Sequence, residues 1–180
     1  MERRLLVVVD MQNDFIDGAL GTKEAQAIVD GAADFIKRWE GDIVATRDTH
    51  TDSYLQTQEG MKLPVVHCIR LTDGWQLNKS INQAIAGKII PGDGRMVTVL
   101  DKGQFGCPNL VDVIRNNGPY DDVTLIGLCT GICVVSNSLL IKAYFPEMPV
   151  SVVSGLCACV TPETHQAALT TMKMCQVDII

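Results

Sequence analysis

The 180-residue sequence lacks the features that mark several classes of protein. No run of Lys or Arg exceeds two residues, and 21 acidic residues outnumber 15 basic ones, whereas a nucleic-acid-binding protein is expected to carry a basic patch. The longest apolar runs, such as residues 5–9, fall far short of the roughly 20 residues that span a bilayer. No small-residue cleavage site follows this run, so no signal peptide is indicated. We therefore expect a cytoplasmic protein that binds neither nucleic acid nor a membrane.

The cysteines form no CxxC motif, which leaves little support for a zinc ribbon or a thioredoxin-like redox site. Their number is odd, and a chain of this length does not need disulfides to be stable. We expect reduced thiols, most of them buried like small apolar side chains, with at most one or two carrying chemistry. The seven cysteines are Cys68, Cys107, Cys129, Cys133, Cys157, Cys159 and Cys175.

Apolar runs alternate with segments of helical period along this chain, which is 47% apolar and 20% charged. The apolar runs predict strands at residues 4–9, 42–46, 96–100, 123–128, 150–154 and 177–180. The periodic segments predict helices at residues 24–39, 78–86, 108–116, 131–143 and 162–175. This alternation predicts an α/β fold, a three-layer α/β/α, Rossmann-like domain around a six-stranded, mainly parallel sheet.

For this single domain of residues 1–180 we assume the doubly wound strand order 3-2-1-4-5-6. Strands one and four are then neighbours where the winding reverses, and sites form outside the carboxyl ends of strands at such a point. Asp10 and the turn at residues 129–133 are therefore expected to meet. Residues 47–95 lack strong periodicity, and we interpret them as a long decorated loop of functional importance.

The segment GLCTGICVVSN at residues 127–137 leaves a predicted strand and enters a predicted helix. A thiol at a helix N-terminus lies near the positive end of the helix dipole and near unpaired N–H groups, which favour a thiolate and can bind a developing oxyanion. Cys133, in the first helical turn, is the candidate nucleophile. Cys129 is expected to contribute its backbone. The alternative for Cys133 is a buried core thiol.

Two other predicted strands end in charged residues. Asp10 ends the first strand. It is either a structural residue that caps a helix or forms a turn, or a functional residue that acts as a base toward a thiol or binds a cation. Lys102 follows the third strand, either as a solvated lysine or as a cation that lowers the pKa of the cysteine.

Two of the three histidines lie in the decorated loop together with an aspartate. Asp48 and His50 are two residues apart on an extended segment, so their side chains point the same way. With His67 they form a set of two histidines and one carboxylate, which suits Zn, Fe or Mn. The alternative for His67 is a structural histidine. His165, in the last predicted helix, is expected to pack or cap that helix.

Five segments match a known family in order and spacing: VVVDMQNDF, ATRDTH, LPVVHC, LDKGQFG and GLCTGICVVSN. Together they resemble the isochorismatase-like cysteine hydrolase superfamily, from about residue 4 to the end of the chain. The resemblance implies a three-layer fold and an Asp-Lys-Cys triad of Asp10, Lys102 and Cys133. It also implies a non-prolyl cis peptide at Leu128-Cys129, and an oxyanion hole formed by the N–H groups of Cys129 and Cys133.

The set of Asp48, His50 and His67 resembles the metal-binding nicotinamidase/pyrazinamidase branch of this superfamily. That branch implies a divalent metal ion, and hydrolysis of nicotinamide to nicotinate and ammonia through a thioester, as part of NAD salvage. The small-molecule amide would be held with its ring nitrogen on the metal. The resemblance also implies a homo-oligomer, a dimer or a tetramer.

Two positions depart from the pattern of that branch. Pro64 stands where many nicotinamidases have an aromatic residue, so Phe15 and Phe105 become the candidates that clamp the pyridine ring. Gly131 stands where the family turn often has an aspartate. The alternative functions are hydrolysis of another small amide, a ureido compound or a vinyl ether, and a non-catalytic metal- or ligand-binding domain.

Overall fold

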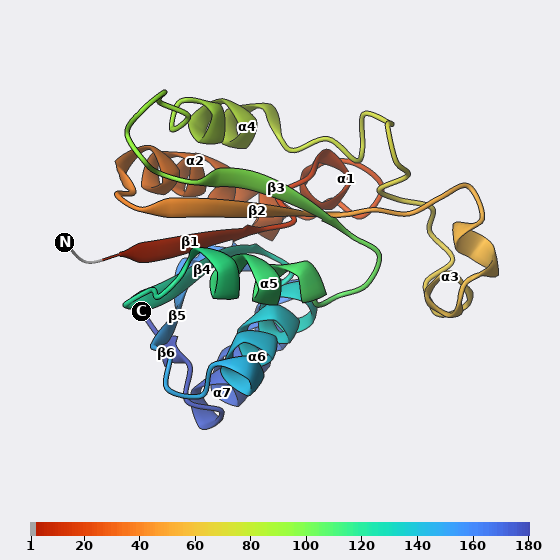
Figure 1. Cartoon of the computed structure of the whole chain (residues 1–180). Coiled ribbons are helices and arrows are strands. Elements are labelled where there is room, and N and C mark those ends of the chain that lie inside the picture. The colour runs from red at the N-terminus through yellow and green to blue at the C-terminus, as the bar shows by residue number, and fades with distance from the viewer. Residues whose placement is uncertain (1–2) are drawn as a thin grey trace.

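Within residues 3–180, which this computed structural model describes, six strands form one sheet through the middle of the molecule (Figure 1). Their order is β3-β2-β1-β4-β5-β6, and every neighbouring pair is parallel. The predicted fold class and strand order are therefore confirmed. The strands are β1 Arg4–Val9, β2 Asp42–Asp48, β3 Val97–Lys102, β4 Asp122–Leu128, β5 Val150–Ala158 and β6 Asp178–Ile179.

The apolar run of β1 is covered on both faces of the sheet. Successive side chains of a strand point to opposite faces. Leu5, Val7 and Val9 are fully buried in one apolar cluster, whereas Leu6 and Val8 are fully buried in the other. Such burial on both faces is typical of a parallel sheet between two helix layers.

Two helix layers cover the sheet (Figure 1). Helices α2 and α4 contribute Ile36 and Ile81 to the cluster on one face. Helices α5, α6 and α7 contribute Leu110, Ile141 and Met172 to the cluster on the other face. The helices are α1 Asn13–Ile16, α2 Lys23–Arg38, α3 Gln58–Lys62, α4 Lys79–Ala86, α5 Pro108–Asn117, α6 Val135–Tyr144 and α7 Pro162–Met174.

Three strands, β2, β3 and β5, extend past the carboxyl ends that the sequence pattern predicts. β5 continues beyond residue 154 to Ala158, because its pairing with β4 resumes after a register shift between Leu125 and Gly127. β2 continues beyond residue 46, and Asp48 pairs with Lys102 of β3. The extension of β2 places the Asp48 side chain at the edge of the sheet where the parallel strands end.

The helix predicted at residues 131–143 does not begin as a regular α-helix. Residues Thr130–Val134 form a π-helical turn, η2, and α6 follows it. Turns of this kind are rare and occur frequently at functional sites. This one carries Cys133.

The segment between β2 and β3 corresponds to the decorated loop. It contains a 3₁₀ turn, η1 (Tyr54–Gln56), and helices α3 and α4, and its part around α3 projects away from the sheet (Figure 1). An isolated bridge between Gln12 and Leu77 ties it to the residues that follow β1. The segment therefore passes over the end of the sheet where β1 finishes.

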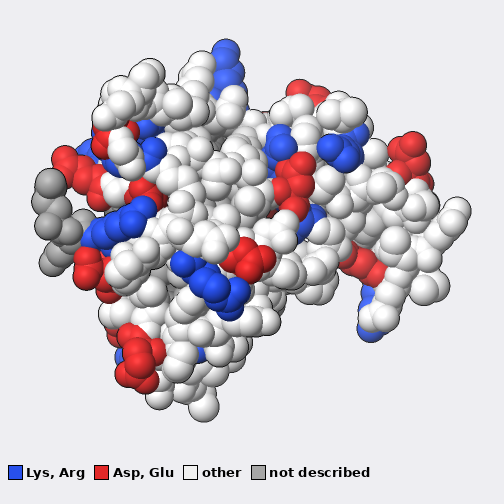
Figure 2. All heavy atoms as spheres, in the orientation of Figure 1, with Lys and Arg blue, Asp and Glu red and all other residues white. Residues whose placement is uncertain are grey.

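No helix within residues 3–180 combines the length and apolar character needed to cross a membrane. On the face shown in Figure 2, Lys and Arg side chains are interspersed with Asp and Glu side chains. This face therefore carries charges of both signs rather than a single basic patch.

Candidate active site

Three strand ends place an acid, an amine and a thiol together at the carboxyl edge of the sheet. Asp10 follows β1, Lys102 ends β3, and Cys133 lies in the π-helical turn after β4. The Lys102 Nζ atom lies 2.7 Å from Asp10 Oδ2 and 3.5 Å from Cys133 Sγ. All three side chains are buried. The structure thus brings together the three residues of the expected triad, while their catalytic roles stay a prediction.

The surroundings of Asp10 direct one carboxylate oxygen at Lys102. Asp10 has a φ of 47°, a left-handed conformation that is uncommon for residues other than glycine. The Thr46 hydroxyl donates to Asp10 Oδ1 at 2.6 Å, and the Asp10 N–H donates to the Thr46 carbonyl at 3.2 Å. Oδ1 is therefore occupied, and Oδ2 faces the Lys102 ammonium.

Burial determines the protonation of the three groups. It raises the pKa of the Asp10 carboxyl above its ordinary value, although Lys102 acts in the opposite direction. Burial, with the charge of Asp10 adding to it, raises the pKa of the Cys133 thiol well above its ordinary value. For Lys102, burial acts to lower the pKa, but Asp10 and Cys133 outweigh it and the pKa is raised.

The free protein therefore holds a neutral thiol beside an ammonium group. Desolvation of the buried sulfur opposes the effect expected from the start of the helix, and it outweighs the attraction of Lys102. A reaction at this sulfur needs a nearby base to accept its proton. Asp10, whose carboxylate contacts the same Lys102 ammonium as the Cys133 sulfur, is the buried group that can supply such a base.

The turn before Cys133 has the backbone features that the resemblance implies. The Leu128-Cys129 peptide bond is cis. Gly127 has a φ of 117°, and a Cβ at this position would collide with the Val9 carbonyl, so glycine is required where β1 and β4 end side by side. An oxyanion hole formed by the N–H groups of Cys129 and Cys133 stays a prediction.

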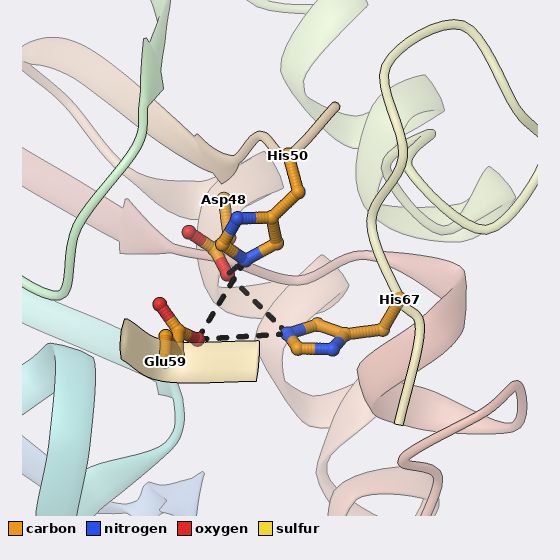
Figure 3. A group of neighbouring side chains, drawn as sticks. All are labelled: Asp48, His50, Glu59 and His67. Carbon is orange, nitrogen blue, oxygen red and sulfur yellow. Dashed lines mark hydrogen bonds and ion pairs between the residues drawn. The ribbon is translucent and has the colours of Figure 1, made fainter. Parts of the chain in front are cut away.

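A second group of side chains includes Asp48, which contacts Lys102 of the triad. Figure 3 shows the members of this group. Asp48 ends β2, His50 and His67 belong to the long segment, and Glu59 lies in α3. One potential ligand atom from each lies within 4.8 Å of the others. Asp48 Oδ2 is 2.9 Å from His50 Nε2 and 3.7 Å from His67 Nε2. Glu59 Oε1 is 3.6 Å from His50 Nε2. We call these four residues the donor set.

The donor set fits a divalent metal ion. Imidazole nitrogens and carboxylate oxygens are the ligands that Zn²⁺, Fe²⁺ and Mn²⁺ take in proteins. His67 Nδ1 lies 2.7 Å from the Val65 carbonyl, to which it donates its proton, so Nε2 is the nitrogen that faces the other donors. Asp48, His50 and His67 are buried, so most of the set is shielded from water.

Comparisons with known proteins agree with this geometry. Residues 4–180 match the family model of the isochorismatase domain. The chain belongs to the isochorismatase family. Its relatives include the nicotinamidase of Escherichia coli (strain K12), which is 28% identical over 199 residues that cover 97% of this chain and 92% of the relative. The resemblance to isochorismatase-like hydrolases is therefore confirmed.

Solved structures similar to this isochorismatase domain cover nearly all of it. The pyrazinamidase of Pyrococcus horikoshii in complex with zinc has a TM-score of 0.79 and 25% identity, covering 99% of this chain and 98% of that one. The pyrazinamidase/nicotinamidase of Streptococcus mutans UA159 has a TM-score of 0.84 and 27% identity, covering 98% and 99%. The similarity therefore includes the strand ends and the long segment that build the site.

Asp48 connects the donor set of this isochorismatase domain to its triad. Its Oδ2 faces His50, while its Oδ1 lies 3.4 Å from Lys102 Nζ. Gln12 Nε2 donates to the Asp48 carbonyl at 2.8 Å, and the Asp48 N–H donates to Gln12 Oε1 at 2.7 Å. Burial acts to raise the pKa of Asp48, but His50, His67 and Lys102 hold it well below its usual range. A charged carboxylate is thus shared between both groups.

The two candidate clamping residues lie in different surroundings. The Phe15 ring is 5.4 Å from the His67 ring, next to the donor set. Phe105 is 45% exposed, on the loop that follows β3. The sequence reasoning overlooked Tyr54, a buried residue whose ring lies 4.6 Å from the His50 ring and 4.9 Å from the His67 ring. Substrate binding by Phe15 and Phe105 stays a prediction.

The sequence reasoning also overlooked Glu59, the fourth member of the donor set. It lies in the first turn of α3, where Thr57 caps the helix by accepting from the Gly60 N–H. An acidic residue in a first helical turn is ordinarily explained by the helix dipole. The weak signal that distinguishes Glu59 is its place on a short helix between the two histidines.

Residues on the far side of the turn behave as structural residues. His165 Nδ1 lies 2.8 Å from Thr130 Oγ1, so it packs α7 against the turn, in agreement with the expected role. Gly131 is exposed, and a Cβ there would lie 3.1 Å from Cys159 Sγ. All seven cysteines are free, and all except Cys129 and Cys175 are buried.

Proposed function

We propose that this protein is a cysteine-dependent amidohydrolase that converts nicotinamide and water to nicotinate and ammonia through a thioester. The observation that carries this proposal is the convergence of Asp10, Lys102 and Cys133 beside the donor set at one edge of the sheet. The relatives named nicotinamidase and pyrazinamidase support the same reaction.

The first half of the proposed reaction forms the thioester. Cys133 Sγ attacks the amide carbonyl carbon while Asp10, which contacts the same Lys102 ammonium as the sulfur, takes the thiol proton. Lys102 stays protonated and balances the charge of Asp10. The N–H groups of Cys129 and Cys133 hold the oxyanion, a kind of contact worth about 10²–10³-fold in kcat per donor.

The second half releases both products. Protonated Asp10 gives its proton to the amide nitrogen as the C–N bond breaks, and ammonia leaves. A water molecule then attacks the thioester carbonyl while Asp10 accepts a proton from it. The C–S bond breaks, the proton returns to Cys133, and nicotinate is released. Asp10 thus accepts and returns a proton twice in each cycle, for which a carboxyl with a raised pKa is suited.

We propose that the donor set holds a divalent metal ion, with zinc favoured over iron and manganese by the zinc-containing pyrazinamidase structure. When bound, the ion supplies a Lewis acid that can bind the ring nitrogen of a pyridine carboxamide. Phe15, beside His67, would then pack against the ring, and Phe105 would lie at the rim.

The test measures ammonia release from nicotinamide and pyrazinamide by protein loaded with metal. We expect wild-type protein to release ammonia from both amides, and Cys133→Ala to release none, because this variant lacks the thiol that contacts Lys102. Cys157→Ala, which removes a different buried thiol, is the matched control and should stay active. No ammonia from either amide would overturn the nicotinamidase proposal, and release from another amide would favour the alternative substrates.

We further infer that residues 1–180 act as a single hydrolase domain, supported by the family match over residues 4–180. A cytoplasmic location is supported by the seven free cysteines. A place in NAD salvage follows from the proposed product. The expected dimer or tetramer is tested by light scattering.

A further inference from the structure

The amine and the thiol of the triad are not carried by neighbouring strands. Lys102 ends β3 and Cys133 follows β4, and the sheet places β2 and β1 between these strands. The hydrogen-bond ladder of the sheet therefore connects them only through two intermediate strands. Their 3.5 Å separation needs a shorter connection if it is to be held closely.

Asn137 provides such a connection. This fully buried residue lies in α6, four positions after Cys133. Its Nδ2 donates to the Cys133 carbonyl at 2.8 Å and to the Phe105 carbonyl at 3.2 Å. Its Oδ1 accepts from the Cys107 N–H at 2.8 Å. One side chain thus joins the nucleophile turn to the segment that follows Lys102.

That segment has few other attachments. For residues 103–106, the described part of the chain shows a single hydrogen bond, the one from Asn137 to the Phe105 carbonyl. Residues 103–105 are exposed, and Gly103 and Gly106 lie at the two ends of the segment. Glycine adds conformational freedom, so these residues do not hold the segment in place by themselves.

The chemistry of the amide matches this task. An asparagine side chain offers two N–H donors and one carbonyl acceptor, so it can bind two backbone carbonyls and one backbone N–H together. Aspartate lacks the donors, and serine is too short to reach three partners. Asparagine is also a poor helix former. Its presence, fully buried, in the first turn of α6 is therefore explained by these contacts rather than by helix propensity.

We propose that Asn137 is a positioning residue for the reaction proposed above. It fastens the segment after Lys102 to the turn that carries Cys133, and so sets the distance between the ammonium and the sulfur. It touches neither the substrate nor the reacting atoms. The inference rests on the proposed function only for the identity of the substrate.

The test compares Asn137→Ser and Asn137→Asp with the same substitutions at Asn117. Asn117 Nδ2 also donates to the carbonyl four residues earlier, that of Val113, but it lies in α5 and joins no second segment. The serine variant can keep the local bond to the Cys133 carbonyl while losing the connection to residues 105 and 107. The aspartate variant keeps the size of the side chain and the acceptor, in case the serine variant does not fold.

We expect both Asn137 variants to lose about 10–100-fold in kcat for nicotinamide, with a smaller change in KM, since misplacement of a reacting group by about 1 Å can cost about 10²-fold. In Asn137→Ser, hydrogen–deuterium exchange should accelerate at the Cys107 N–H, which donates to Asn137 in the wild type, and stay unchanged in β4. The Asn117 variants should match the wild type in both measurements.

Two results would overturn the inference. One is unchanged exchange of the Cys107 N–H in folded Asn137→Ser. The other is faster exchange with wild-type kcat, which would show that the connection does not position the reacting groups. If wild-type protein releases no ammonia from nicotinamide, the proposed function fails by itself. In that case a crystal structure of Asn137→Ser tests the positioning role of Asn137. A distance between Lys102 Nζ and Cys133 Sγ that is still near 3.5 Å overturns the inference.

Discussion

The triad and the donor set lie side by side but are built differently. Asp10 and Cys133 follow strands of the sheet, Lys102 ends one, and all three are buried. In the donor set only Asp48 ends a strand, and the Glu59 side chain is 22% exposed. Strand ends are held by their neighbours and by two apolar clusters, whereas α3, which carries Glu59, lies outside both clusters. This part of the long segment is therefore expected to open more easily. The fold therefore positions the triad. The donor set depends in part on the long segment, which a bound ion can order.

The largest effect is expected within the triad. Asp10→Asn keeps the shape of the side chain but removes the base for the Cys133 thiol, so kcat for nicotinamide should fall by about 10²–10⁴-fold. Ammonia release by protein with full metal content measures this. Asp122→Asn is the control, because Asp122 pairs with Arg4 at the start of β4, and it should leave kcat unchanged. Wild-type kcat in Asp10→Asn would exclude Asp10 as the base.

Removing the metal should affect the donor set, and with it activity, but not the folding of the sheet that carries the triad. We expect metal-free protein to lose activity yet keep its helices, as seen by circular dichroism, because the sheet and its clusters contain no ion ligand except Asp48. Added zinc at about 1,000 times its Kd should stabilise the protein by about 4 kcal/mol, measured as a rise in Tm.

His67→Ala should remove that rise in Tm, since it deletes one buried donor. Unfolding of the whole chain on chelation would contradict the comparison, because it would make the sheet as dependent on the ion as the long segment.

A smaller effect is expected from Glu59, the partly exposed donor. Glu59→Gln removes its charge and should raise the Kd for zinc by about 10–100-fold, comparable to the loss of a supporting partner of a metal ligand. Glu24→Gln is the matched control, because Glu24 also lies in the first turn of a helix. Competition titration with a chromophoric chelator measures both. Equal Kd values for Glu59→Gln and wild type would restrict the donor set to three residues.

The smallest effect concerns the resting thiol. Iodoacetamide should label the exposed Cys175 first. In a Cys175→Ser background, labelling of Cys133 should be slow at pH 7 and rise by about tenfold per pH unit, because alkylation requires the thiolate and burial raises the pKa of this thiol. Peptide mass spectrometry gives the rate at each pH. Rapid labelling at pH 7 that does not change with pH would show a resting thiolate.

Sequence patterns predict the regular part of the molecule well. The strands follow from apolar runs, and the doubly wound order assumed for them, which brings Asp10 to the turn of Cys133, is the one observed. Three of the four donors follow from a set of two histidines and one carboxylate. The apolar runs are informative because a strand buried on both faces tolerates few polar residues. A polar residue at its end is therefore conspicuous.

The irregular parts could not be predicted in the same way. Glu59 and Tyr54 belong to short helical turns, where no periodicity distinguishes a buried or ligating side chain from an exposed one. The π-helical turn at Cys133 has the same composition as an α-helix start. The protonation of Cys133 depends on burial in three dimensions, which the position in a helix does not reveal.

The central claim is that Cys133 carries the acyl group during turnover, and acid-quenched peptide mapping tests it most directly. Metal-loaded protein in excess over nicotinamide is quenched within the first turnover and its peptides are weighed. The account predicts a nicotinoyl thioester on the peptide that contains Cys133, and neither adduct nor nicotinate with Cys133→Ala. An adduct on another residue, or nicotinate formed by Cys133→Ala at the wild-type rate, would contradict it.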